Sequence, residues 1–271
     1  MQFTFKIQSF QEDAVDNIVE VFRGESLTNN SLYRYDDGVK KPRFYTNEGL
    51  FFKEDIAYSN HPISLTPEQL LSNINRIQQQ NHIKKSSKLD KTLGGCSIDI
   101  EMETGTGKTY VYINTMFELN KHYGWNKFIV VVPSIAIREG VKKTFQITED
   151  HFMGRYGKKA RYFVYDSSQL MELEQFSTSS DINVMIINSQ AFASSFKKEG
   201  SNKNSKIIFS ERDEFQSRCP IDVIAANNPI VILDEPQKLK GTGTQNVLKE
   251  SFNVLFSLHF SATHEIKHNL V

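Results

Sequence analysis

The chain has 271 residues, 39% of them hydrophobic, and its 32 basic residues balance 32 acidic ones. This composition is typical of a globular protein of one or two domains, and it excludes a chain that is basic overall. Its two cysteines, Cys96 and Cys219, exclude a disulfide framework or a paired-cysteine metal site. The chain shows neither a signal peptide pattern nor a long apolar run, so we expect a cytoplasmic protein without membrane contact.

The first 95 residues are predicted to form a helical and loop segment. Apolar residues at helical spacing predict a helix over residues 10–22, and polar, turn-rich sequence follows up to about residue 62. A second helix is expected after Thr66, which can cap it, with Pro67 in its first turn. The pair Gly94-Gly95 ends this segment.

From Cys96 onward, short apolar runs alternate with stretches of helical spacing. Several runs are apolar on consecutive residues, which is typical of strands buried on both faces. We therefore expect residues 96–271 to form an α/β domain with a mainly parallel sheet and helices on both of its faces. A polar stretch at about 194–228 is predicted to interrupt it as an insertion. The predicted strands lie at residues 96–102, 127–133, 161–166, 182–188, 229–235 and 258–263.

The sequence METGTGKT (residues 102–109) lies between a predicted strand and a predicted helix, which is the context of a phosphate-binding loop. Gly105 and Gly107 allow the backbone to wrap closely around phosphates. Lys108 can reach the terminal phosphates, and the hydroxyl of Thr109 can bind Mg²⁺. Met102 departs from the usual first glycine, which argues against small GTPases and simple kinases. The predicted nucleotide-binding residues here are Thr104, Gly105, Thr106, Gly107, Lys108 and Thr109.

A second acidic motif, DEPQ, follows the apolar run that ends at Asp234 and Glu235. Asp234 can bind Mg²⁺, and Glu235 can orient and deprotonate an attacking water. Acids at the end of a strand are by themselves a weak signal. Their position downstream of a phosphate loop favours a site that hydrolyses a nucleotide.

With these motifs, the chain resembles superfamily 2 helicases and translocases. It is most similar to the restriction (Res) subunits of type III restriction-modification enzymes, over METGTGKTYVYINTMFEL, FIVVVPSIAIREG, VILDEPQ and FSATHEIKHNL. The resemblance implies a RecA-like P-loop NTPase lobe that uses ATP and Mg²⁺. It also implies action on double-stranded DNA together with a methylation (Mod) subunit.

The resemblance also implies roles for individual residues. Gln11 would read the adenine edge, although it could equally be a polar residue at a helix start. Gln237 would act with Lys108, Asp234 and Glu235 in catalysis and would hydrogen-bond to the SAT motif. The strand of this motif would lie beside the phosphate-loop strand, and the motif would couple hydrolysis to movement through Ser261 and Thr263. Expected contacts to nucleic acid are Pro133, Ser134, Arg138, Ser189 and Gln190, among which Ser134 could equally be only a helix cap.

Members of this family carry a second RecA-like lobe and a nuclease domain, which we do not find in the 271 residues. We therefore expect a fragment or a truncated product that binds nucleotide weakly and translocates little in isolation. Alternatives left open are a nucleotide- or partner-binding module that is inactive alone and another superfamily 2 helicase. An unrelated P-loop enzyme, such as a nucleotide kinase, leaves DEPQ and SATH unexplained.

Overall fold

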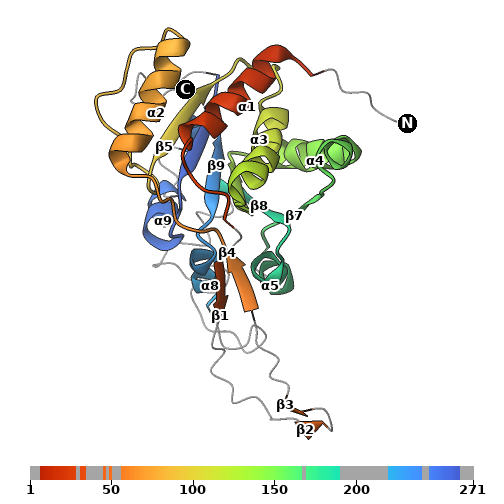
Figure 1. Ribbon diagram of the computed structural model, residues 1–271. Helices are drawn as coiled ribbons and strands as arrows, with labels where there is room; N and C mark the ends of the chain where they lie inside the picture. Colours follow the sequence, from red (N-terminus) through yellow and green to blue (C-terminus); the bar gives the residue numbers. More distant parts are fainter. Residues whose placement is uncertain are drawn as a thin grey trace.

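The computed structural model describes residues 7–28, 56–166, 169–189, 219–239 and 244–262, together with short strands at 31–34, 45–46 and 49–50. Its main feature is a six-stranded sheet in the order β5-β10-β9-β6-β8-β7, in which every neighbouring pair is parallel (Figure 1). The predicted parallel sheet is confirmed, because each strand coincides with one of the six apolar runs. The strands are β5 (Ser97–Glu101), β6 (Lys127–Val132), β7 (Ala160–Val164), β8 (Ile182–Asn188), β9 (Ile230–Asp234) and β10 (Ser257–Ser261).

Helices cover both faces of this sheet, which completes the predicted α/β architecture. One face carries α1 (Ser9–Val21), α2 (Pro67–Gln80), α3 (Lys108–Tyr123) and α4 (Ile135–Tyr156). The other face carries α5 (Leu170–Thr178), α8 (Pro220–Ala226) and α9 (Thr244–Ser251). Within the ranges given above, no helix is long and apolar enough to cross a membrane.

The remaining elements are short. A 3-10 helix, η2 (Pro236–Leu239), follows β9. Two antiparallel pairs precede α2: β1 (Ser31–Arg34) with β4 (Ile56–Ser59), and β2 (Tyr45–Thr46) with β3 (Gly49–Leu50).

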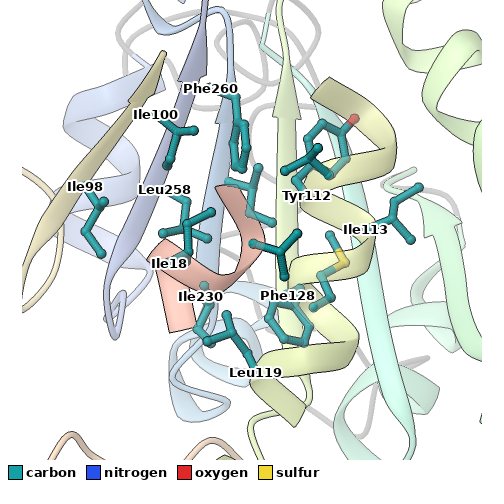
Figure 2. Packing of buried hydrophobic residues seen from close by; sticks show 14 of the residues in the cluster. Ile18, Ile98, Ile100, Tyr112, Ile113, Leu119, Phe128, Ile230, Leu258 and Phe260 are labelled. Atoms are coloured by element: carbon teal, nitrogen blue, oxygen red, sulfur yellow. The ribbon is translucent and has the colours of Figure 1, made fainter. Parts of the chain in front are cut away.

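Alternation along the strands explains the two helical layers. In β6, Phe128 and Val130 belong to the core cluster under α1 and α3, whereas Ile129 and Val131 belong to the cluster under α5, α8 and α9. Successive side chains of a strand point to opposite faces, so a strand that is apolar at every position must be covered twice. Figure 2 shows the first cluster, with sheet side chains such as Phe128 pointing into the layer that contains Leu119 of α3.

The segment before residue 95 packs into this same core. Ile18 of α1 and Ile74 of α2 are fully buried in the cluster that also holds the sheet residues Ile98 and Leu258. Thr66 caps α2, as predicted, and the structure adds a capping box in which the Gln69 side chain accepts from the Thr66 amide. The division of the chain at residue 95 stays a prediction.

Part of the stretch expected as a polar insertion is a buried helix. Residues 190–218 lie outside the described residues, but α8 follows them, and its Ile221 and Ile224 are buried against the sheet. The extent of the insertion stays a prediction, but its last part, α8, packs against the sheet in the second core cluster.

Candidate nucleotide site

Parallel strands bring the predicted motifs to one edge of the sheet. The loop after β5, the acids after β9 and the SAT segment after β10 all follow the carboxyl ends of strands. Because β10 lies between β5 and β9, these three segments are neighbours in space although they lie far apart in the sequence. This is the edge at which open α/β sheets bind their ligands.

The loop between β5 and α3 has the backbone that a phosphate cradle needs. Gly105 and Gly107 both adopt positive φ angles, 84° and 89°. The hydroxyl of Thr106 donates to the carbonyl of Glu103 at 2.6 Å, which closes the turn. Gly107 occupies the N-cap position of α3, so the first free amides of this helix face the loop.

Gln11 of α1 lies directly on this loop. Its Nε2 donates to the carbonyl oxygen of Thr106 at 2.8 Å. A Cβ atom at Gly107 would lie 2.6 Å from the same Nε2. The positive φ therefore favours glycine at position 107, and any larger residue there would also displace the Gln11 amide from its contact with the loop.

Lys108 forms an ion pair with the second acid of DEPQ. Its Nζ lies 2.9 Å from Oε1 of Glu235, and both side chains are nearly buried, with 11% and 12% exposed. The same Nζ lies 3.4 Å from the carbonyl oxygen of Met102. The phosphate loop and the DEPQ motif are therefore connected directly by an ion pair.

The two adjacent acids have opposite pKa shifts. Burial and the neighbouring charge of Glu235 raise the pKa of Asp234 to about 6. Burial also acts to raise the pKa of Glu235, but hydrogen bonds from Lys108 and Gln237 outweigh it, and the pKa falls below its usual value. At neutral pH the site therefore contains an ionised Glu235 that is paired, and an Asp234 whose charge is poorly compensated.

A chain of hydrogen bonds connects Glu235 to the SAT segment. Gln237 donates from Nε2 to a carboxylate oxygen of Glu235, and its Oε1 accepts from the hydroxyl of Ser261 at 3.0 Å. The backbone of Glu235 has a φ of 55°, which is unfavourable for a residue with a side chain, and its amide donates to the carbonyl of Phe260 at 2.8 Å. The structure thus brings Gln237 against Ser261; Thr263 lies outside the described residues.

The residues expected to contact nucleic acid follow β6 and β8 at the same edge. Pro133 is buried, and the Ser134 hydroxyl caps α4 by accepting from the amide of Ile137. Arg138, on the first turn of α4, pairs with Glu139. Ser189 is fully buried, which weighs against a direct contact from its side chain. Gln190 lies outside the described residues.

One contributor was missed in the sequence, where Met102 was noted only as a departure from the motif. Met102 is buried, its amide donates to the carbonyl of Ser261 at 2.9 Å, and its carbonyl faces Lys108. Its side chain continues the apolar core at the end of β5, where a glycine would leave a gap. The signal was the apolar residue directly after an apolar strand.

An all-parallel sheet, two helical layers and this loop at the carboxyl edge define a class, the RecA-like P-loop nucleotide-binding domains. The family model described as type III restriction enzyme, res subunit, matches residues 4–266, and the chain belongs to this family.

Curated relatives agree with this family. The chain is 31% identical over 228 residues to the type III restriction-modification enzyme EcoP15I Res subunit of Escherichia coli. This match covers 76% of this chain and 22% of the relative. It is also 31% identical over 227 residues to the EcoPI Res subunit of Escherichia phage P1, which covers 75% and 22%. The chain therefore spans about a fifth of the length of these relatives.

Among solved structures, the chain is similar to the Sulfolobus solfataricus SWI2/SNF2 ATPase core in complex with dsDNA. The sequence identity is 12%, the TM-score is 0.38, and the match covers 76% of this chain and 33% of the other. A TM-score of this size adds nothing to the fold established above.

Proposed function

We propose that this chain is the ATP-binding lobe of an ATP-dependent DNA translocase, the restriction subunit of a type III restriction-modification enzyme. Its substrate would be double-stranded DNA, its partner a methylation (Mod) subunit, and its location the cytoplasm. The observation that carries the proposal is the 2.9 Å contact between Lys108 and Glu235, extended through Gln237 to Ser261. Membership of the res subunit family supports the DNA and Mod parts of the proposal.

The loop residues suit the phosphates of ATP. The backbone from Thr104 to Gly107 curves with two positive φ angles, and a Cβ at Gly105 would meet no atom within 4 Å. The loop is therefore open where a phosphate would approach, and Lys108 supplies a positive charge at its end. Gln11, which holds this loop through the carbonyl of Thr106, would contact the base.

The donor set at the end of β9 suits Mg²⁺. Asp234 offers carboxylate oxygens, and Thr109 offers a hydroxyl on the first turn of α3; hard oxygen ligands of this kind are those that Mg²⁺ prefers. Burial raises the pKa of Tyr112 on α3 well above its usual value, and the charge of Asp234 adds to this effect. Asp234 is 5% exposed, so a cation would offset the cost of its charge.

These contacts support the following roles for the residues in hydrolysis. When bound, Mg²⁺ would neutralise charge that develops on the phosphates. Lys108 would leave Glu235 and bind the terminal phosphates. The freed carboxylate of Glu235, still held by Gln237, would orient the attacking water and accept its proton. Ser261 would then sense the change through Gln237.

The proposal is tested by measuring ATP turnover of the chain with and without duplex DNA, beside an Asp234→Ala variant. Turnover that rises with DNA and disappears in the variant would support a motor lobe. If parent and variant are equally inactive while both bind nucleotide, the chain by itself is a binding module. If duplex DNA neither binds nor alters turnover, the DNA part of the proposal is wrong.

A further inference from the structure

A ladder of buried polar residues crosses from β5 to β10 on the face opposite α1 and α3. In the register of this strand pair, Ser97 lies opposite Ser257, and Asp99 lies opposite His259. Ser97, Asp99 and Ser257 are buried and the His259 side chain is 12% exposed, although the neighbouring positions Ile98 and Leu258 form the apolar core of the other face. Buried polar groups at successive rungs need mutual hydrogen bonds, and here they have them.

The contacts form a continuous chain. Nδ1 of His259 lies 2.9 Å from Oδ1 of Asp99, and Nε2 of His259 lies 3.0 Å from Oγ of Ser257. A carboxylate can only accept, so Nδ1 donates to Asp99, while the single proton of the Ser257 hydroxyl is shared among Nε2 of His259 and two neighbouring oxygens. Oγ of Ser257 also lies 3.1 Å from Oγ of Ser97 and 3.0 Å from the carbonyl oxygen of Leu93.

Serine, histidine and aspartate in this order also occur in hydrolases that use a serine nucleophile. Access excludes that function here. Ser257 is 0% exposed and lies beneath the turn at Leu93, so neither a substrate carbonyl nor water can approach its hydroxyl. The chain of hydrogen bonds must therefore act on the protein itself.

The ladder selects one register between the two strands. A slip by one residue would turn His259 into the apolar core, so the apolar pattern alone forbids it. A slip by two residues keeps every apolar side chain on its face. It would, however, place His259 opposite Ser97 or Glu101 and leave Asp99 without its partner. The Asp99–His259 pair therefore discriminates between registers that the apolar residues cannot.

The register matters because β10 ends in the nucleotide site. Ser261 lies two residues after His259 on the same face, and its hydroxyl donates to Gln237. Its carbonyl accepts from the amide of Met102, the residue that begins the phosphate loop. A slip of two residues would move these groups by about 7 Å.

We propose that Asp99 and His259 are positioning residues that hold the Ser261 end of β10 in register with the phosphate loop. This inference rests on the proposed function, since the loop and Ser261 matter to turnover only if the site hydrolyses ATP. Neither residue touches the reacting atoms; both act through the backbone of β10.

The test compares four variants in the 271-residue chain. Asp99→Leu and His259→Leu remove the pair, whereas Asp99→Asn retains an oxygen that can accept from Nδ1. Ile98→Val is the matched control, since it loosens the apolar face of the same strand and leaves the ladder intact. Thermal unfolding identifies folded variants. Amide hydrogen exchange at Met102 and Glu235, together with kcat and KM for ATP, provides the readouts.

We expect both leucine variants to exchange the Met102 amide about tenfold faster or more, the scale of losing a hydrogen bond to a charged group. Their kcat should fall about tenfold with KM changed less than about twofold, since orientation fails but ATP still binds. Asp99→Asn should keep both the exchange rate of the Met102 amide and kcat close to the parental values. Parental exchange and kcat in the leucine variants, or the same changes in Ile98→Val, would overturn the inference.

Two further outcomes keep this inference separate from the proposed function. If the leucine variants do not fold, the Asp99→Asn variant decides. A Met102 amide exchange rate within about twofold of the parent supports the inference that an oxygen at position 99 holds His259 by accepting a hydrogen bond, and a tenfold change contradicts it. If the parent neither binds nor hydrolyses ATP, the proposed function fails. The exchange rate at Met102 still decides whether the pair holds the register.

Discussion

The Nζ atom of Lys108 lies 2.9 Å from Oε1 of Glu235, although the two residues are separated by the greater part of the domain's sequence. The contact is nearly buried, so it is stronger than an exposed ion pair. A phosphate that approaches the loop must therefore compete with Glu235 for the same ammonium group.

This competition predicts the effect of Glu235→Gln. The variant should bind Mg-ATP about three- to tenfold more tightly than the parent, because the charge that holds Lys108 is removed. It should also hydrolyse no ATP. Titration with a fluorescent ATP analogue measures the affinity, and Glu103→Gln, an exposed change in the same loop, is the control. Weaker binding by Glu235→Gln would show that the ion pair does not oppose the nucleotide.

The contact of Gln11 with the loop predicts a specific role for its amide. Gln11→Ala removes the hydrogen bond to the carbonyl of Thr106 and should weaken ATP binding about fivefold, the scale of one neutral hydrogen bond. Gln11→Glu should weaken it further, because a carboxylate would face a carbonyl oxygen. Asp13→Asn, on the exposed side of α1, should leave the affinity unchanged. Equal ATP affinities in the parent and the three variants would contradict this role.

The raised pKa of Asp234, about 6, predicts how stability changes with pH. Between 3.8 and about 6 the folded chain keeps a proton that the unfolded chain has lost. The contribution of Asp234 to the free energy of unfolding must therefore fall as pH rises through this window, and it stays low above it. Urea unfolding should show this dependence in the parent and not in Asp234→Asn, with the variant more stable by about 1–3 kcal/mol at pH 7.

The pKa of Asp234 also predicts how Mg²⁺ binding depends on pH. A proton and Mg²⁺ compete for the Asp234 carboxylate, so the Mg²⁺-dependent part of ATP affinity should decline as pH falls below about 6. Titrations at pH 5 and pH 7.5, with and without Mg²⁺, measure it. An Mg²⁺ effect of equal size at both values would contradict Asp234 as a ligand.

Lys127 at the start of β6 predicts a second, opposite pH dependence. Its ammonium is buried and donates to the carbonyls of Phe176 and Ser179 at the end of α5. Burial lowers its pKa to about 7, so between about 7 and 10.5 the unfolded chain binds a proton that the folded chain has lost. Stability should therefore rise with pH across this window in the parent, and not in Lys127→Met. Lys88→Met, an exposed change, should retain the parental dependence.

The local parts of the structure were predictable from the sequence. Each apolar run became a strand, and the glycines of the phosphate loop adopt the positive φ angles that their sequence suggests. These features depend on neighbouring residues or on burial on two faces, which the sequence displays directly.

The non-local contacts were harder to predict. The pairing of Lys108 with Glu235 and that of Asp99 with His259 depend on β10 lying between β5 and β9. The family resemblance implied that β10 lies beside β5, but residue patterns along the chain specify neither the full strand order nor these side-chain contacts. The burial of Ser189 and of α8 was also missed, because it depends on packing against the rest of the fold, which the local sequence does not display.

Mg-ATP binding at the phosphate loop is the central property of this site, and isothermal titration calorimetry of the purified chain measures it directly. We predict one site per chain, with affinity at least about tenfold weaker in Lys108→Ala, since that variant loses a charge-assisted contact to phosphate. Lys143→Ala, an exposed lysine on α4, should bind as the parent does. An absence of binding by the parent, or equal binding by Lys108→Ala, would contradict the assignment of this site.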